Sequence, residues 1–225
     1  MLEILLIRHG ETDWNREQKI MGNRPIPLNS IGIQQAEAVG HSLRSVGVDA
    51  IYTSPLKRAV QTARAIARMK KIKWIESPEV AEIYYGSWIG KKFSEVREEP
   101  AYICYHTSPS EAQIPGGEKM VDVHARVVGF VERLRKKHED GRIVVVSHAD
   151  VIKTILVHYM NLHLNDILKF RIDNCSISLL WFGGQHVRVL GLNCQTELGH
   201  LFASLNQPPL HSPEKSLQQK KSAKK

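Results

Sequence analysis

The sequence predicts an α/β fold, a three-layer α/β/α sandwich with a mainly parallel central sheet. Segments with the apolar pattern of strands alternate along the chain with segments of helical period, which is typical of a parallel sheet covered by helices. Residues 143–146 are an uninterrupted run of β-branched side chains, as expected for a central strand that is covered on both faces. We find no internal repeat, which argues against a repeat architecture.

The first strand is expected at residues 2–7, an apolar run that ends abruptly in charged and glycine residues. A long loop through Gly22 follows it. The first helix then begins at Asn29 or Ser30, because either side chain can cap a helix N-terminus. Its apolar positions recur every three or four residues, at Ile33, Ala36, Gly40, Leu43 and Val46.

The second strand is expected at residues 48–53, and the helix after it at residues 56–69. Ser54 and Pro55 predict the start of this helix, because they place a hydroxyl N-cap before a proline at the first helical position. A short strand at residues 73–75 completes this part of the chain.

A second long helix is expected at residues 117–138, and Gly141 prevents it from continuing. The strand 143–146 comes next, followed by a helix at residues 151–160. The apolar face of the long helix consists of Met120, Val123, Val127, Phe130 and Leu134.

The C-terminal part of the chain holds two final strands and a polar tail. The strands at residues 176–182 and 186–192 are joined by a tight glycine turn, which predicts a hairpin. A chain of 225 residues fits one compact domain, which we expect at residues 1–205. Residues 206–225, rich in Pro, Ser, Gln and Lys, are expected to be a disordered tail.

The positive charge is concentrated at this end of the chain. The formal net charge is +8, and the tail holds five lysines against Glu214 alone, so half of that charge lies outside the expected domain. This distribution argues against nucleic acid as a partner. The remaining charge suits an enzyme that attracts anionic substrates, although a solvated basic surface explains it equally well.

The composition also bears on location. The apolar fraction of 42% and the charged fraction of 24% are near the averages for globular proteins, and no apolar run approaches the length of a membrane span. The N-terminal segment has neither a basic n-region nor a secretory apolar region, so we expect a cytoplasmic protein without a membrane partner. The three widely spaced cysteines argue against a disulfide framework or a zinc–thiolate site. A homodimer is compatible with the sequence.

Three residues carry the first indication of chemistry. His9 and His148 each follow a predicted strand, and the carboxyl ends of strands are where ligands bind in open parallel sheets. We therefore expect the two histidines to converge. Arg58 stands in the first turn of its helix, where a cation opposes the helix dipole at a cost of about 0.3–1 kcal/mol. Such a placement makes sense if an anion lies in front of it.

Phosphate is the natural candidate for this anion, because helix N-termini bind it and guanidinium groups match its oxygens. Arg8 and Arg58 would supply that geometry, and His148 could add a donor. A neutral His9 would be a competent nucleophile, since imidazole, with a pKa near ~6.5, has a free lone pair around neutral pH. The arrangement requires no metal and no organic cofactor, and the expected partner is a small phosphorylated metabolite.

Less specific interpretations stand beside this one. Taken alone, His148 could be a structural histidine, Glu82 a solvated carboxylate and Arg58 half of a surface ion pair. The aromatic residues Tyr84, Tyr85 and Trp88 could line a substrate mouth or pack a loop against the core. A zinc hydrolase is disfavoured, because His158 and His163 are spaced wrongly to share a helix face. A binding module without turnover is a further alternative.

Five segments in order along the chain carry a family resemblance. They are residues 6–15 (Leu-Ile-Arg-His-Gly-Glu-Thr-Asp-Trp-Asn), 53–63, 82–90, 115–118 and 145–149. They resemble the motifs of the histidine phosphatase superfamily, which includes the cofactor-dependent phosphoglycerate mutases, and the resemblance covers roughly residues 3 to 190. The resemblance implies a phosphoglycerate mutase-like fold.

The same resemblance implies a role for each matching residue. His9 would become a transient phosphohistidine, with its phosphoryl oxygens held by Arg8, Arg58 and His148. Glu82 would protonate the leaving oxygen and then activate water, a role worth about 10²–10⁴ in rate. The substrate pocket would also be lined by Asn15, Met21, Gly22 and Ala149.

Two departures and one spacing bear on the reaction. The chain has Pro25 and Ile89 where the family often has acidic residues, which affects loop conformation and substrate choice but not the catalytic positions. The short interval from Glu82 to His148 is similar to that of the phosphatase branch, since mutases carry an insertion there that helps to enclose the substrate. The expected activity is therefore hydrolysis of phosphomonoesters, with a mutase as the alternative.

Overall fold

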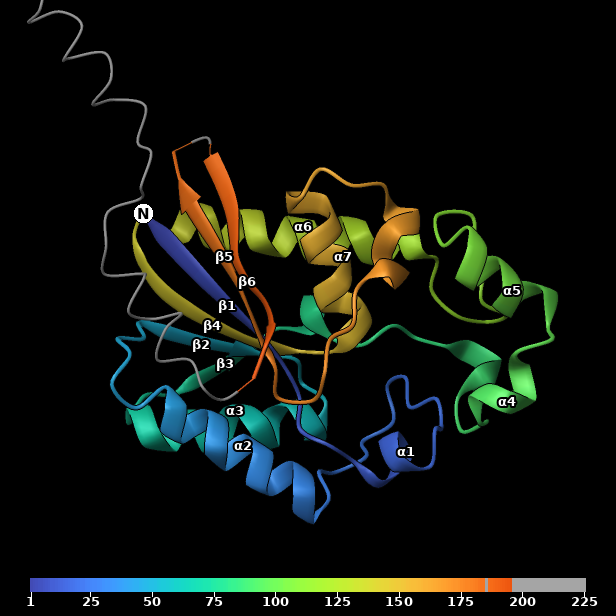
Figure 1. The fold of residues 1–225 in the computed structure, drawn as a ribbon, viewed down its shortest axis with the longest axis horizontal. Helices are drawn as coiled ribbons and strands as arrows, with labels where there is room; N and C mark the ends of the chain where they lie inside the picture. Colours follow the sequence, from blue (N-terminus) through green and yellow to red (C-terminus); the bar gives the residue numbers. More distant parts are fainter. Residues whose placement is uncertain (185, 196–225) are drawn as a thin grey trace, which may run out of the picture.

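The fold is seen in a computed structural model, which describes residues 1–184 and 186–195 (Figure 1). In these residues one mixed sheet has the strand order β3-β2-β4-β1-β5-β6. The first four strands in this order run parallel, and β5 and β6 form an antiparallel hairpin. The strand bounds are β1 (Leu2–Arg8), β2 (Ala50–Thr53), β3 (Trp74–Glu76), β4 (Gly141–Ser147), β5 (Ile177–Gly183) and β6 (His186–Cys194).

Helices cover both faces of the sheet, as the three-layer prediction requires. In Figure 1, α2 and α3 lie below the sheet and α6 and α7 above it. The bounds of the α-helices are α1 (Asp13–Arg16), α2 (Ser30–Ser42), α3 (Lys57–Lys70), α4 (Phe93–Val96), α5 (Pro100–Thr107), α6 (Met120–Lys137) and α7 (Ala149–Tyr159). Three 3₁₀-helices are also described, η1 (Pro78–Val80), η2 (Gly86–Trp88) and η3 (Leu164–Lys169).

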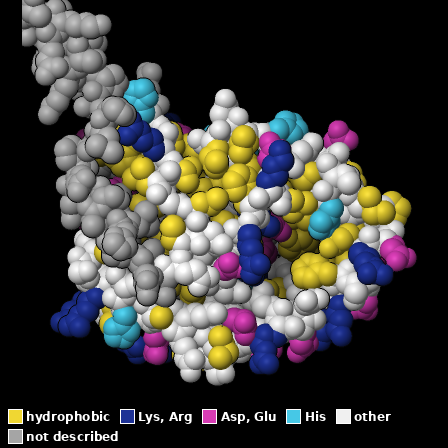
Figure 2. Space-filling model, viewed as in Figure 1, with side chains coloured by type: hydrophobic (Ala, Val, Ile, Leu, Met, Phe, Trp, Pro, Cys, Tyr) yellow, Lys and Arg dark blue, Asp and Glu magenta, His cyan; other side chains and the backbone are white. Residues whose placement is uncertain are grey.

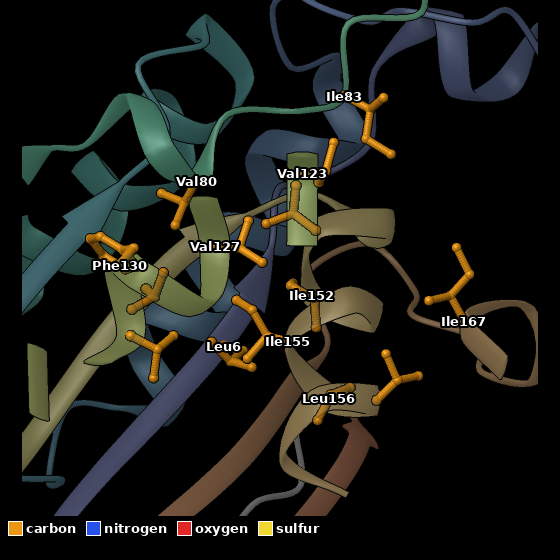
Figure 3. Close-up of a cluster of buried hydrophobic side chains, with 14 of the residues drawn as sticks. Leu6, Val80, Ile83, Val123, Val127, Phe130, Ile152, Ile155, Leu156 and Ile167 are labelled. Atoms are coloured by element: carbon orange, nitrogen blue, oxygen red, sulfur yellow. The ribbon is translucent and has the colours of Figure 1, made fainter. Parts of the chain in front are cut away.

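The side chains of β1 alternate between two cores. Ile4 and Leu6 belong to the cluster under α6 and α7, while Leu5 and Ile7 belong to the cluster under α2 and α3. Figure 3 shows Leu6 directed between side chains of α6 and α7. All four side chains are completely buried, and burial of such a residue is worth about 1.5–3 kcal/mol. Both faces of β1 therefore hold the strand in place.

The segment between β3 and α6 forms no strand. It contains η1, η2, α4 and α5, and Figure 1 shows α4 and α5 beside α1, to one side of the sheet. This side region is anchored to α7 through hydroxyl groups. The hydroxyls of Tyr85 and Tyr105 both donate to Asp150 Oδ2, at 2.5 and 2.7 Å.

Several element predictions need correction. Ser54 does not cap α3, whose N-cap is Leu56, and the helix begins at Lys57. The hydroxyl of Ser54 instead lies 2.8 Å from His148 Nε2. Ile33 was expected in the core but is 46% exposed, and the helix buries Val39 in its place.

Boundaries also differ from those expected. The long helix begins at Met120, three residues after its expected start, and β2 begins at Ala50. The helix after β4 extends from Ala149, and the disordered tail expected at residues 206–225 lies outside the described residues.

Candidate active site

The register of β1 and β4 brings His9 and His148 together. Arg8 pairs with Ser147 at the carboxyl ends of the two parallel strands, so the next residue of each chain segment is one of the histidines. The two imidazole rings lie 5.1 Å apart between centroids. The convergence expected from the strand pattern is therefore present.

The imidazole of His9 is held in one tautomer. Its side chain is buried, and Nδ1 lies 2.7 Å from the carbonyl oxygen of Gly10, which can only accept a hydrogen bond. Nδ1 therefore carries the proton, and Nε2 is the unprotonated nitrogen. Burial, together with the charges of Arg58 and Arg8, lowers the pKa of His9 well below its usual value. The ring is thus neutral, as a nucleophile must be.

Two glycines place this histidine. A Cβ atom on Gly10 would lie 2.5 Å from the carbonyl oxygen of Gly32, at the start of α2. In turn, a Cβ atom on Gly32 would collide with the backbone of Glu11. The backbone after His9 therefore crosses the first turn of α2 at a distance that leaves no room for a side chain.

Arg58 stands in the first turn of α3 and is completely buried. Its Nε–H donates to His9 Nε2 at 3.3 Å, while Nη1 and Nη2 donate to the carbonyl oxygens of Arg24 and Gly22 at 3.0 and 2.8 Å. Burial lowers the pKa of Arg58 to about 10, so the guanidinium stays charged at neutral pH. Its Nε–H is directed to the nitrogen atom that would attack phosphorus.

The Ser54 hydroxyl is the hydrogen-bond partner of His148. It accepts a hydrogen bond from the Leu56 amide at 3.2 Å and lies 2.8 Å from His148 Nε2. In the tautomer in which this hydroxyl donates to Nε2, His148 Nδ1 carries the ring proton. This buried nitrogen has no hydrogen-bond partner among the described residues, and it lies 3.9 Å from Glu82 Oε2. It is a donor without an acceptor.

Arg8 provides a second donor of this kind. Its Nη1 donates to the carbonyl oxygen of Ile172 at 2.7 Å, but its buried Nε has no partner in the part of the chain that the structure describes. A buried donor without a partner costs about 1–3 kcal/mol. Arg8 and His148 therefore have donors that an anionic ligand would satisfy.

Glu82 has the properties of an acid near neutral pH. Burial and the neighbouring charge of Asp150 raise its pKa to about 7, against the opposing effect of Arg58. Burial alone would also raise the pKa of Asp150. Its hydrogen bonds from Lys153, Tyr85 and Tyr105 outweigh burial and lower that pKa. Asp150 is thus ionised at neutral pH, whereas Glu82 gains and loses its proton in that range.

A cavity of about 570 Å³ lies in front of these groups. Six of the predicted site residues contribute to its wall, namely Arg8, Asn15, Met21, Gly22, Glu82 and Ala149. His9, Arg58 and His148 are not part of this wall and are almost completely buried. The structure therefore groups the predicted residues into a lining set and a buried set.

Ile89, one of the two positions where the sequence departs from the family pattern, contacts the loop after α1. Gly22 has a positive φ of 50°, and a Cβ atom there would lie 2.8 Å from Ile89 Cδ1. Ile89 thus packs against the loop whose carbonyl oxygen holds Arg58. The Asn15 side-chain oxygen accepts a hydrogen bond from the Thr12 amide at 3.1 Å. The Thr12 hydroxyl in turn donates to the sulfur atom of Met21.

Four polar residues of the site were missed by sequence reasoning. Ser54 was interpreted as a helix cap, and Asp150 follows His148 without any local sign of its partners. Thr62 Oγ1 accepts the Gly10 amide at 3.0 Å, and Asn174 Nδ2 donates to the His9 carbonyl at 2.9 Å. Asn174 precedes β5, far along the sequence, so only the strand order brings it to His9.

The aromatic residues fit both of their interpretations. Trp88 is buried and its indole nitrogen donates to Glu99 at 2.7 Å, which is a packing role. Tyr85 and Trp88 nevertheless contribute to the cavity wall. Tyr84 does not line this cavity, and it is 42% exposed.

Within residues 1–184 and 186–195, no group of three or more His, Cys, Asp or Glu side chains is arranged to hold a metal ion. No helix in the same ranges combines the length and the apolar character needed to cross a membrane.

Comparison with known proteins gives consistent matches. Residues 4–195 match the model of the histidine phosphatase superfamily (branch 1). The chain is 31% identical over 204 residues to phosphoserine phosphatase 1 of Hydrogenobacter thermophilus, covering 90% of this chain and 97% of that protein. It is 37% identical over 158 residues to a metal-independent phosphoserine phosphatase of Arabidopsis thaliana, covering 68% and 66%.

A solved structure is similar over nearly its whole length. A mutant phosphoserine phosphatase from Entamoeba histolytica, in complex with phosphoserine, has a TM-score of 0.81 and 30% sequence identity. The match covers 88% of this chain and 98% of that chain.

Proposed function

The chain belongs to the histidine phosphatase superfamily, and from this premise we propose that His9 is its nucleophile and Glu82 its proton donor in the hydrolysis of small phosphomonoesters. The observation that carries the proposal is the fixed tautomer of His9, whose unprotonated Nε2 accepts a hydrogen bond from Arg58 Nε at 3.3 Å. The resemblance to this family implies a phosphohistidine intermediate, and the buried histidine with a depressed pKa has the neutral form that this chemistry needs.

In the first step, Nε2 of His9 attacks phosphorus and the bond to the leaving oxygen breaks. The phosphoryl oxygens accept hydrogen bonds from Arg8 Nε, Arg58 and His148 Nδ1, which stabilise the charge of the transition state. Glu82 gives its proton to the leaving oxygen, so an alcohol departs. The raised pKa of Glu82, about 7, keeps that proton available near neutral pH.

In the second step, the ionised Glu82 acts as a base. It takes a proton from a water molecule, whose oxygen attacks phosphorus as the bond to His9 breaks. Inorganic phosphate forms, and both Glu82 and His9 return to their starting protonation states. The one carboxyl group serves both steps because each returns it to the state that the other requires.

The residues of the cavity wall complete the proposed site. Asn15, Met21, Gly22 and Ala149 would surround the phosphorylated end of the substrate. Mutase activity is the second candidate, since a probable phosphoglycerate mutase of Proteus mirabilis is 31% identical over 180 residues. Hydrolysis is favoured because the relative that matches 90% of this chain and the similar solved structure are phosphoserine phosphatases. Phosphoserine, which is the ligand of the similar structure from Entamoeba histolytica, belongs in any substrate panel. A cytoplasmic location and a homodimer stay predictions.

The test is to trap the phosphoenzyme. Wild-type protein incubated with a ³²P-labelled aryl phosphate and quenched rapidly should retain label that is stable to alkali and labile to acid. His9→Ala should retain none, because no other described imidazole combines this burial with a free Nε2 beside an arginine. His41→Ala, at an exposed histidine of α2, is the control and should label normally. Labelling of His9→Ala at the wild-type level would contradict the proposal.

A further inference from the structure

The part of the cavity wall that lies away from His9 is rich in aromatic and apolar side chains. We refer to the following five residues as the outer wall: Phe93, Tyr102, His106, Leu168 and Phe170. They come from α4, from α5 and from the segment around η3. Figure 2 shows a hollow on this face of the molecule with hydrophobic side chains around it. A cavity of about 570 Å³ also has room for a leaving group much larger than the phosphoryl group.

The central ring of the outer wall is held rigidly. Tyr102 packs edge-on against Trp88 with 5.5 Å between ring centroids, and its other neighbour is His106, at 4.1 Å. Trp88 is in turn buried and hydrogen-bonded to Glu99. A ring fixed in this way presents a preformed surface, so a ligand that packs on it pays little ordering entropy.

Phe93 points to the same conclusion by its exposure. It lines the cavity while 45% of its surface is accessible, unlike the aromatic residues of the core. A large aromatic side chain that is left exposed at a cavity gains apolar contact when a ligand enters. The outer wall therefore favours an apolar ligand group.

The charges of the cavity wall are already paired. Lys153 binds Asp150 at 2.9 Å and Arg171 binds Asp173 at 2.7 Å. Lys19 likewise pairs, with Glu17. In the described part of the wall, Arg8 is the one cation without a carboxylate partner, and it belongs to the phosphoryl end. An anionic leaving group would compete with the carboxylates of Asp150, Asp173 and Glu17 for these cations, whereas a neutral group leaves the pairs as they are.

We propose that the preferred substrate is a phosphomonoester whose leaving group is a neutral alcohol bearing an aromatic ring or a similar apolar group, which packs on Tyr102 and Phe93. This inference rests on the proposed function. Specificity then comes from the outer wall, whereas the phosphoryl group is held by Arg8, Arg58 and His148.

The first experiment compares 2-phenylethyl phosphate with ethyl phosphate. Both have primary alkyl leaving groups of similar reactivity, so a difference in kcat/KM reports contacts of the ring. We expect kcat/KM to be about ten-fold or more higher for the phenylethyl ester, from burial of the ring. Equal values, or a higher value for phosphoserine, would overturn the inference. Turnover of neither alkyl ester nor of an aryl phosphate would overturn the proposed function and this inference with it.

The second experiment locates the preference. Tyr102→Ala should lower kcat/KM for 2-phenylethyl phosphate about ten-fold while changing that for ethyl phosphate by less than about two-fold, and Tyr102→Phe should keep the preference. Ile103→Ala is the matched control, because Ile103 lies on the same helix, is 50% exposed and does not line the cavity.

A variant in α4 guards against an effect that comes from loss of α5. Phe93→Ala removes a half-exposed ring and should lower the preference without unfolding the protein. If Tyr102→Ala and Phe93→Ala each reduced turnover of both alkyl esters equally, a specificity role for the outer wall would be overturned.

Discussion

At the scale of single residues, the role proposed for Glu82 predicts that Glu82 and its neighbour Asp150 set the pH range of activity. Burial and the charge of Asp150 raise the pKa of Glu82 to about 7. A proton donor must be protonated before the chemical step, so the active fraction is complete well below this value and is lost as the pH rises through it. Asp150 stays ionised because Lys153 and two tyrosine hydroxyls stabilise its charge.

Asp150→Asn should move the alkaline limb of the pH profile to lower pH. The substitution removes a negative charge near Glu82 and leaves Lys153 without its partner, and both changes favour the ionised form of Glu82. The measurement is kcat/KM for an alkyl phosphate as a function of pH. Asp166→Asn, which breaks an ion pair with Lys169 on η3, is the control and should leave the limb unchanged. A limb that stayed in place in Asp150→Asn would show that Asp150 does not control the protonation of Glu82.

The site residues that the sequence predicts follow a local pattern, whereas those that it does not predict depend on contacts distant in sequence. His9 and His148 follow strands, so their place in the fold could be inferred from local pattern. Ser54 and Asn174 act through partners that are distant in sequence, at 2.8 Å from His148 and 2.9 Å from the His9 carbonyl. Nothing within a few residues of either one indicates these contacts.

At the scale of elements, a residue before the start of α3 contacts the site and does not act as the N-cap of the helix. Its N-cap, Leu56, makes no side-chain cap hydrogen bond, although Ser54 lies two residues earlier. The Ser54 hydroxyl accepts the Leu56 amide and orients His148. A residue suited to capping is thus used to orient a histidine of the site.

Ser54→Ala should therefore impair turnover more than stability. Loss of its hydrogen bonds should cost about 0.5–2 kcal/mol in the free energy of unfolding, while kcat should fall about ten-fold or more because His148 Nε2 loses its partner. Steady-state kinetics and urea unfolding measure the two effects. Ser42→Ala removes a comparable hydroxyl at the end of α2, which donates to the Val39 carbonyl at 2.9 Å, and should leave kcat unchanged. A normal kcat in Ser54→Ala would rule out this role.

Long elements with a clear period were predicted well, and short ones were not. The five apolar positions expected on the long helix are all buried in α6, because a face repeated over several turns leaves few alternatives. By contrast, α1, α4 and α5 were not predicted. The first two contain four residues each, and α5 contains eight. Their positions depend on distant contacts such as those of Tyr105 with Asp150, which a local pattern cannot show.

At the scale of the whole molecule, the sheet positions the site because its strands are fixed on both faces. The registers of β1 with β4 and of β2 with β4 place the ends of three strands at one edge. The α/β fold and its parallel centre followed from strand and helix alternation. The strand order did not follow, since β1 pairs with β4 and with β5, both of them distant in sequence.

Leu6→Ala should test this dependence. Leu6 is completely buried in β1, two residues before Arg8, so truncation should lower the free energy of unfolding by about 2–5 kcal/mol. Urea unfolding followed by circular dichroism measures the change. The matched control is Ile33→Ala, at a position that is 46% exposed, where the change should stay within about 0.5 kcal/mol. Similar losses in the two variants would contradict the described layers.

The close crossing of Gly10 and Gly32 has a consequence for any library of single substitutions. Neither position contacts the proposed reaction, yet a side chain at either one collides with backbone atoms of the other segment. Even alanine should therefore score as badly as replacement of His9 itself in a growth selection. A map of the positions that do not tolerate substitution would therefore include Gly32 of α2 among the functional residues, although the cause there is steric. Selections scored by folding as well as by turnover would separate the two kinds of intolerance.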